Sequence, residues 1–454
     1  MTRISRDVMM TILDRVPEMH RFLTVSELDA SSERLTRQYS PVAQLVQIGE
    51  STDGDPIRML RIGHGAEQLL FFACPHPNEP IGAMAMETLA QLLCEDEALR
   101  GTKYTWNLIK CIDPDGTRLN EGWFGGPFTV TNYATHFFRP GATMQAEWTF
   151  PMLYKTYGFF RPIAETQALM TAITGLRPRF IYSLHNAGLG GGYYYLTPHQ
   201  PALDDALRSL ITERGIPLSL GEPEMPWGVK LSDAIYKTPT LRDQYDFIAR
   251  QSSEDPADIL KMGEGSYGYA EGVSNPSHLM CELPYFFDPR TADTSATEGT
   301  RREAILRGLT RTQPLIELLT NSLEQVAGKL THPSRLRDAS LEIVPMLARN
   351  LQMQRTWAET APELDTPATV AGVFDSTLGY PFYRLLFLGM ARRALRRQLL
   401  TSDSADIRQA LERLDEGFEK WAGEMEAELD YRAIPIRDLV QIQIGAGLYS
   451  IDAL

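Results

Sequence analysis

The 454-residue chain is predicted to fold as an α/β layer structure with a largely parallel sheet, followed by a helical region. Three observations predict this class. Between about residues 41 and 300, short apolar segments typical of strands alternate with segments that have helical periodicity. Beyond about residue 300, long helical patterns appear without further strands. Apolar residues make up 43% of the chain and charged residues 22%, an ordinary globular composition that excludes disordered and fibrous classes.

The first forty residues are predicted to form two helices. Apolar residues from Val8 to Val16 recur on one helical face. Thr24 and Glu27 have the spacing of a capping box, in which each side chain bonds the backbone of the other at the start of a helix. Pro41 then closes this helix. We therefore expect residues 1–40 to be an N-terminal helical segment that precedes the sheet.

Residues 41–300 contain the expected strands and are predicted to form the catalytic domain. The segment 69–73 is a continuous apolar run bounded by turn residues, which is typical of a buried central strand. Further strands are expected at 45–48, 57–62, 106–112, 180–184, 193–196 and 279–283, and helices at 82–94, 165–173 and 202–213. The segment 113–160 is rich in Gly, Pro and aromatic residues, and a loop of that length is usually functional.

Residues 301–454 are predicted to form a C-terminal helical region. Its expected helices are 304–323, 341–357, 382–400 and 407–429. No motif there indicates a function. The region could cap a site, carry a partner interface or join subunits, so a homo-oligomer held by these helices is one expectation.

Charge and cysteine usage exclude several partners and compartments. The chain has 44 Lys and Arg against 58 Asp and Glu, a net charge of −14, whereas nucleic acid and anionic membranes require a basic surface. No apolar run is long enough for a membrane span. Asp7 and Asp14 interrupt the stretch that a secretory signal would need. The four cysteines form no Cys-x-x-Cys pair. These features predict a cytoplasmic protein that binds neither nucleic acid nor membrane.

Side chains with metal or acid–base chemistry stand at the ends of three expected strands. His76 and Glu79 follow the strand 69–73 and are one helical turn apart, so both can hold one ion. His185 follows the strand 180–184, and Glu282 lies near the end of 279–283. The carboxyl ends of parallel strands meet at one edge of a sheet. Catalytic zinc takes three protein ligands and a water molecule, which predicts one Zn²⁺ per chain on the two histidines and Glu79, with Glu282 as the base.

On these residues the chain resembles the zinc carboxypeptidase family, the carboxypeptidase A-like metallopeptidases, from about residue 35 to 287. The matching motifs stand in the family's order: Ile48-Gly-Glu-Ser51-Thr-Asp-Gly54, His76-Pro-Asn-Glu79, Asp113-Pro-Asp-Gly116, Glu165-Thr166, Ser183-Leu-His185 and the Glu282 strand. The resemblance implies a three-layer α/β/α fold with a mostly parallel mixed sheet. It also implies zinc-dependent hydrolysis of the C-terminal amide bond of a peptide or small amino-acid conjugate.

The residues that bind substrate match the family less well. The family uses an Asn-Arg pair for the substrate carboxylate and another Arg to polarise the scissile carbonyl. Arg118, soon after the Asp-Pro-Asp-Gly loop, is the candidate for oxyanion stabilisation. Arg139 or Asn120 would hold the carboxylate, although no Asn precedes Arg139. Tyr267 or Tyr269 is the candidate for the family's mobile tyrosine. Solvated surface positions are the alternative for both arginines.

Two other functions remain open at this point. A deacylase of N-acyl amino acids, as in the related succinylglutamate desuccinylase and aspartoacylase families, would share the His-x-x-Glu ligation. The Asp113-Pro-Asp-Gly loop and the Glu282 strand favour the carboxypeptidase branch. A non-catalytic binding protein on the same fold is the third candidate, and the presence of all four metal and base residues argues against it.

Overall fold

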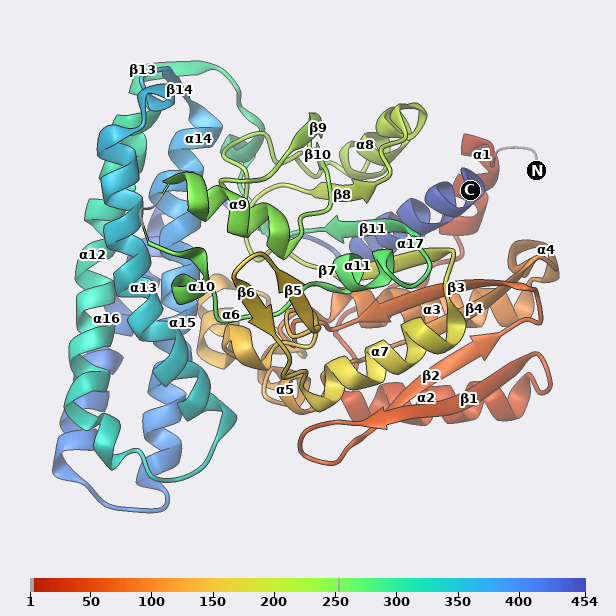
Figure 1. The fold of residues 1–454 in the computed structure, drawn as a ribbon, viewed down its shortest axis with the longest axis horizontal. Helices are drawn as coiled ribbons and strands as arrows, with labels where there is room; N and C mark the ends of the chain where they lie inside the picture. The colour runs from red at the N-terminus through yellow and green to blue at the C-terminus, as the bar shows by residue number, and fades with distance from the viewer. Residues whose placement is uncertain (1–3, 252–253) are drawn as a thin grey trace.

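The computed structural model describes residues 4–251 and 254–454, and its centre is a nine-stranded mixed sheet (Figure 1). The strand order is β1-β2-β4-β3-β7-β11-β8-β10-β9. The strands are β1 (Ala43–Glu50), β2 (Pro56–Ile62), β3 (Glu67–Ala73), β4 (Tyr104–Ile109), β7 (Phe180–His185), β8 (Tyr193–Thr197), β9 (Lys230–Ser232), β10 (Ile235–Tyr236) and β11 (Ser277–Glu282). Every strand expected between residues 45 and 283 is present.

Four neighbouring strands in the middle of this sheet, β4, β3, β7 and β11, run parallel. They consist almost entirely of buried residues, as strands covered on both faces must. In the register, Ala73 of β3 faces Leu184 of β7, and Glu282 of β11 faces His185. The polar groups that follow these strands therefore meet at one edge of the sheet.

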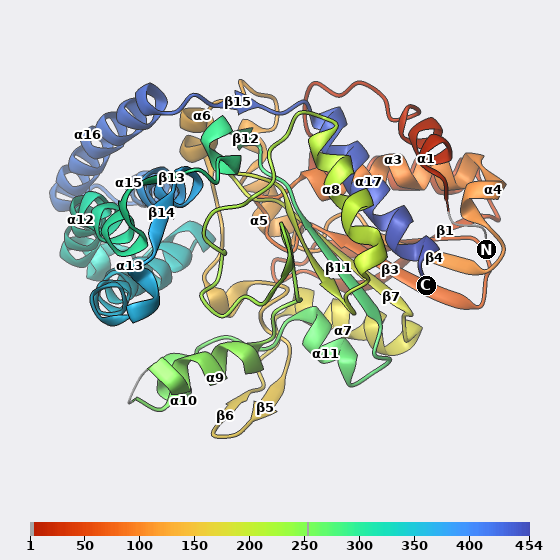
Figure 2. The ribbon, with the colours of Figure 1, turned by 90° about the horizontal axis from the view of Figure 1, so that it is seen from above.

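Helices cover both faces of the sheet, which gives the expected three layers (Figure 2). On one face lie α3 (Ile81–Glu95), α8 (Asp204–Thr212) and α17 (Ile436–Asp452). On the other lie α7 (Ala164–Leu176) and α11 (Ser266–Glu271). The capping box expected at Thr24 and Glu27 is formed at the start of α2 (Val25–Gln38).

The last helix, α17, returns from the helical region to pack on the sheet. It contacts α3, α8, β7 and β11. Gly447 permits the close approach, because a Cβ there would lie 3.0 Å from the Tyr182 ring. Gln443, fully buried, donates a hydrogen bond of 2.9 Å to the backbone carbonyl of His185. The chain end thus supports the strand that carries His185. The division at residue 300 stays a prediction.

The other C-terminal helices form a bundle beside the sheet (Figure 1). They are α12 (Arg301–Val326), α13 (Arg335–Thr360), α15 (Tyr380–Leu399) and α16 (Ala405–Glu428). The contact with the α/β part runs mainly through α15 and α6 (Val130–His136). Buried side chains of β3 and of α15 belong to one continuous apolar core. The bundle is therefore packed against the sheet domain rather than tethered to it.

Shorter elements complete the chain. The helices are α1 (Arg6–Leu13), α4 (Glu97–Arg100), α5 (Pro114–Arg118), α9 (Leu241–Gln251), α10 (Pro256–Ile259) and α14 (Val370–Phe374). The strands form three small pairs: β5 (Met152–Tyr154) with β6 (Tyr157–Phe159), β12 (Phe286–Phe287) with β15 (Arg432–Ala433), and β13 (Ala296–Thr300) with β14 (Pro367–Thr369). Among the described helices, none combines the length and the apolar character that a membrane crossing requires.

Candidate active site

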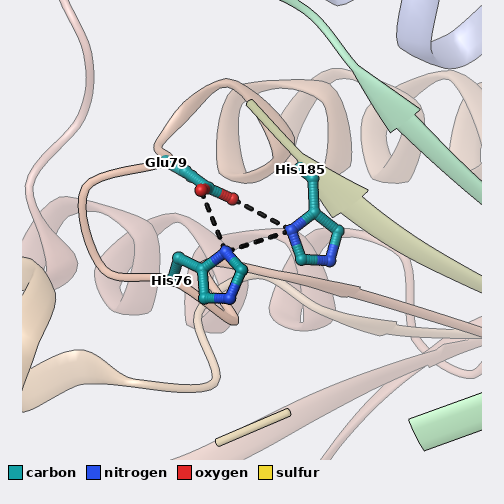
Figure 3. Close-up of side chains that lie close together, drawn as sticks. All are labelled: His76, Glu79 and His185. Carbon is teal, nitrogen blue, oxygen red and sulfur yellow. Dashed lines mark hydrogen bonds and ion pairs between the residues drawn. The ribbon is translucent and has the colours of Figure 1, made fainter. Parts of the chain in front are cut away.

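Three buried side chains converge at the carboxyl edge of the parallel strands (Figure 3). Nδ1 of His76 lies 2.9 Å from Oε1 of Glu79, and Nδ1 of His185 lies 3.1 Å from Oε2 of the same carboxylate. The two Nδ1 atoms are 3.2 Å apart. Two nitrogens held about 2.0–2.1 Å from a tetrahedral zinc ion would lie about 3.3 Å apart. The donor set and its spacing therefore fit a zinc ion.

The local backbone explains why these side chains meet. After β3, Cys74 adopts a left-handed conformation with φ of 54°, which turns the chain sharply away from the sheet. The backbone N–H of Glu79 then donates to the carbonyl of His76 at 3.0 Å, which closes the turn before α3. Gly82, at the start of α3, lies against β7: a Cβ there would be 2.6 Å from the Cβ of Leu184. This close contact sets Glu79 beside the last residue of β7, His185.

The charges around the two histidines differ. Burial and the nearby Arg139 lower the pKa of His76 to about 4. Burial also acts to lower the pKa of His185, but Glu147, Glu79 and Glu282 overcome it and raise that pKa well above the usual range. His76 holds the pKa of Glu79 below its ordinary value despite burial. In this cluster one carboxylate lies between two imidazole rings. A divalent cation can bind such a set of groups in place of the protons that they share.

A second carboxylate, Glu147, orients His185 from the opposite side of its ring. Oε2 of Glu147 lies 2.7 Å from Nε2 of His185. Ser183 donates to the same carboxylate at 2.7 Å, and Ser266 donates to its other oxygen. An anionic partner at Nε2 places the ring proton there and leaves Nδ1 free to face Glu79. Sequence reasoning missed Glu147; its only signal was a charged residue within the apolar part of the 113–160 segment.

Glu282 stands beside the cluster without belonging to it. Its Oε1 lies 3.8 Å from Nδ1 of His185, and its side chain lines the open side of the site. Burial raises the pKa of Glu282 well above the usual range. Burial therefore favours the protonated form of Glu282 more than that of an ordinary exposed carboxyl group.

Arg139 is the cation nearest the cluster. Its Nη1 is 3.4 Å from Oε1 of Glu79, and its Nε is 3.4 Å from Oε1 of Gln145. The guanidinium also lies over the ring of Trp148, 5.4 Å from the centroid. These contacts hold its positive charge at the mouth of the candidate metal centre.

The site opens into a cavity of about 490 Å³. The α/β part supplies His76, Glu79, Arg139 and Glu282 to its lining. The helical region supplies further lining residues, from α13, α15 and the π-helix Asp375–Gly379 that precedes α15. Capping of a site is one of three roles that the sequence leaves open for this region, because helical periodicity locates an apolar face but not the element that it packs against.

Three expected site residues, and Tyr269 as the alternative to one of them, lie outside this cavity. Arg118 donates to Asp55 at 2.9 Å and to Ser26 at 3.1 Å, on a partly exposed surface. Asn120 is fully buried, and its side chain bonds the backbone of Gly116 and Phe138. Tyr267 packs against His278, with ring centroids 5.2 Å apart. The structure thus brings together His76, Glu79, His185, Glu282 and Arg139, but not these three.

The remaining family-like motifs meet at a separate buried node. Asp113, Asp115 and Glu165 form a second cluster of carboxylates. Arg335 of α13 reaches into it, 3.6 Å from Glu165 and 3.7 Å from Asp113, and bonds Asp115 directly. The positive charge in this cluster is the guanidinium of Arg335, which belongs to the helical region. The node therefore links the helical region to the sheet domain.

Comparisons with known proteins agree with the resemblance. Residues 28–126 match the zinc carboxypeptidase family, a range that includes His76 and Glu79. No curated protein sequence matches the chain.

Several solved structures are similar to parts of the chain. The carboxypeptidase A of Helicoverpa armigera is 17% identical, with a TM-score of 0.36, over 62% of this chain and 70% of that one. For a metallo-carboxypeptidase of Burkholderia cenocepacia the identity is 15% and the TM-score 0.33, over 74% and 70% of the two chains. For a metallo-carboxypeptidase of Pseudomonas aeruginosa the values are 14% and 0.35, over 58% and 60%.

Proposed function

We propose that this chain is a zinc carboxypeptidase-like hydrolase and that it hydrolyses the C-terminal amide bond of a peptide or small amino-acid conjugate. One observation carries the proposal: a buried His-Glu-His set converges to ligand spacing beside the carboxylate of Glu282, in the lining of one cavity. His76, Glu79 and His185 would hold the ion. When bound, zinc supplies a water nucleophile that is acidic enough to ionise near neutral pH, together with a Lewis acid for the carbonyl.

Glu282 is the proposed general base and acid. Its carboxylate faces the open side of the cluster, where the attacking water must stand. It accepts a proton from that water and returns it to the nitrogen of the leaving amine. Proton transfer by a positioned group typically contributes about 10²–10⁴-fold to the rate.

Arg139 is the proposed donor to the developing oxyanion, in place of Arg118. Its guanidinium already lies against Glu79, whereas that of Arg118 is bonded to Asp55. A donor fixed before the reaction needs little reorganisation as charge develops, and such a donor is typically worth about 3–4 kcal/mol. Trp148 packs on the Arg139 guanidinium and limits its movement.

Glu282→Gln tests this assignment. The variant should keep one zinc per chain and lose turnover by about 10²-fold or more, because the amide cannot take a proton from water. Glu298→Gln, an exposed position on β13, is the matched control and should retain full activity. A Glu282→Gln enzyme that turns over at the wild-type rate would refute the role of Glu282.

A panel of substrates separates the proposed peptidase from a deacylase. Peptides and N-acyl amino acids should be offered at equal concentrations to the zinc-loaded protein. Turnover of peptides supports the proposal, and turnover of N-acyl amino acids alone overturns it.

A further inference from the structure

The helical region contributes part of the lining of the active-site cavity, including one arginine. From α15, the side chains of Tyr380, Tyr383, Arg384 and Phe387 line it. The same cavity is lined by His76, Glu79 and Glu282. A substrate in this cavity therefore contacts the helices as well as the sheet domain.

The carboxylates of this cavity are already satisfied. Apart from Glu79 and Glu282, the acidic lining residues are Glu222, Glu224 and Asp375. Glu222 is paired with Arg301 at 2.6 Å. Glu224 accepts hydrogen bonds of 2.9 Å from two tyrosine hydroxyls, and Asp375 accepts one of 2.9 Å from a backbone N–H. None of the three requires Arg384 as a counter-ion.

The two arginines that line the cavity differ in the partners that they have. Arg139 contacts Glu79, Gln145 and Trp148. Arg384 forms no hydrogen bond or ion pair in the part of the chain that the structure describes, and its Nε is buried without a partner. Its guanidinium contacts the ring of Tyr380 at 5.9 Å from the centroid. Burial lowers the pKa of Arg384, with only the Tyr380 hydroxyl acting against it.

Arg384 is half-buried. A cation that has lost part of its water and has no counter-ion is unfavourable, and a bound anion reduces this cost. We propose that Arg384 binds a carboxylate group of the substrate, so that the helical region determines specificity at the active site. This inference rests on the proposed function. A guanidinium presents two parallel N–H donors that match a carboxylate. The ionised acidic residues of the lining would repel a doubly charged group more strongly than a carboxylate.

A carboxylate on such a substrate has two sources. It is either the free C-terminal carboxylate or the side chain of an acidic residue. Arg139 lies beside Glu79 and is the proposed donor to the oxyanion, so a free terminal carboxylate needs another cation in this cavity. The two sources share one chemistry and are separated by choice of ligand.

The test measures binding without turnover. Four peptides are titrated by calorimetry into zinc-loaded Glu282→Gln: the last residue is either neutral or acidic, and its terminus is either a free carboxylate or an amide. The titrations are repeated after adding Arg384→Gln, Arg384→Lys or, as the control, Arg397→Gln, which is exposed on the same helix. Thermal unfolding checks that each variant is folded.

Arg384→Gln should weaken binding of the recognised carboxylate by about 10- to 100-fold and leave the matching uncharged peptide unchanged. Arg384→Lys should recover part of the loss, and Arg397→Gln should change nothing. If only the peptides with a free terminus lose affinity, Arg384 binds the terminal carboxylate. If only the peptides with an acidic last residue lose affinity, Arg384 binds the carboxylate of that side chain. Equal binding of all four peptides with and without Arg384 overturns the inference. If the wild type cleaves none of these peptides while the binding difference persists, the proposed function fails and the inference stands.

Discussion

Replacing Glu147 by Gln isolates the contribution of a single charge to the metal centre. The substitution keeps the volume of the side chain and removes its negative charge. In the wild type that charge lies 2.7 Å from Nε2 of His185, fully buried, with Ser183 and Ser266 completing its hydrogen bonds. The neutral amide holds the ring less firmly and no longer favours the tautomer that exposes Nδ1.

The expected magnitude follows from this position. Loss of a hydrogen-bonded partner of a metal-binding histidine typically costs about 10–100-fold in metal affinity. Because Glu147 bonds the ring directly and lies in a buried site, we expect the effect to fall within this range. Zinc affinity is measured by competition with a chromophoric chelator at fixed pH.

Glu165→Gln is the matched control. Glu165 is also fully buried and also accepts two hydrogen bonds, from the backbone and the hydroxyl of Thr52, but it lies in the Arg335 node. Its variant should bind zinc as the wild type does. A folded Glu147→Gln protein with unchanged zinc affinity would refute the reasoning.

Three further changes test other parts of the structure. Arg335→Met should lower the free energy of unfolding by about 3 kcal/mol, measured with denaturant, because Asp113, Asp115 and Glu165 lose their shared cation. Unchanged stability would show that this node does not hold the helical region to the sheet domain. Burial raises the pKa of Asp375 to about 7, above its unfolded value of about 4, so its contribution to stability is lost as pH rises between these values. Asp375→Asn should remove that part of the pH dependence, and identical profiles of stability against pH would contradict the argument. Arg118→Gln should alter kcat/KM less than about twofold, because the residue lies outside the cavity; a large fall in kcat would restore it to the catalytic machinery.

The parallel core of the fold and the candidate metal centre could be predicted from the sequence. The strands β3, β7 and β11 are short apolar runs bounded by turn residues, which is a local signal. Parallel pairing then brings the residues after them to one edge, so that His76, Glu79, His185 and Glu282 meet without knowledge of any other contact.

Contacts between distant segments could not be predicted in this way. α17 is buried over most of its surface, so no polar face marks its orientation, and its return to the sheet depends on the close fit of Gly447 against Tyr182. Arg118 and Arg139 were expected at the site because of their spacing from the family's motifs. The segment 113–160, which contains both arginines and Glu147, has no periodic pattern from which the path of the chain could be predicted. Arg384 lay on an expected helix whose packing partner the sequence does not specify.

The central claim is that His76, Glu79 and His185 hold a catalytic zinc ion. The most direct measurement is zinc content by elemental analysis on the purified protein, paired with peptide hydrolysis before and after chelation. We predict one zinc per chain, loss of hydrolysis when the metal is removed, and recovery when zinc is returned. A metal-free preparation with full activity would contradict it.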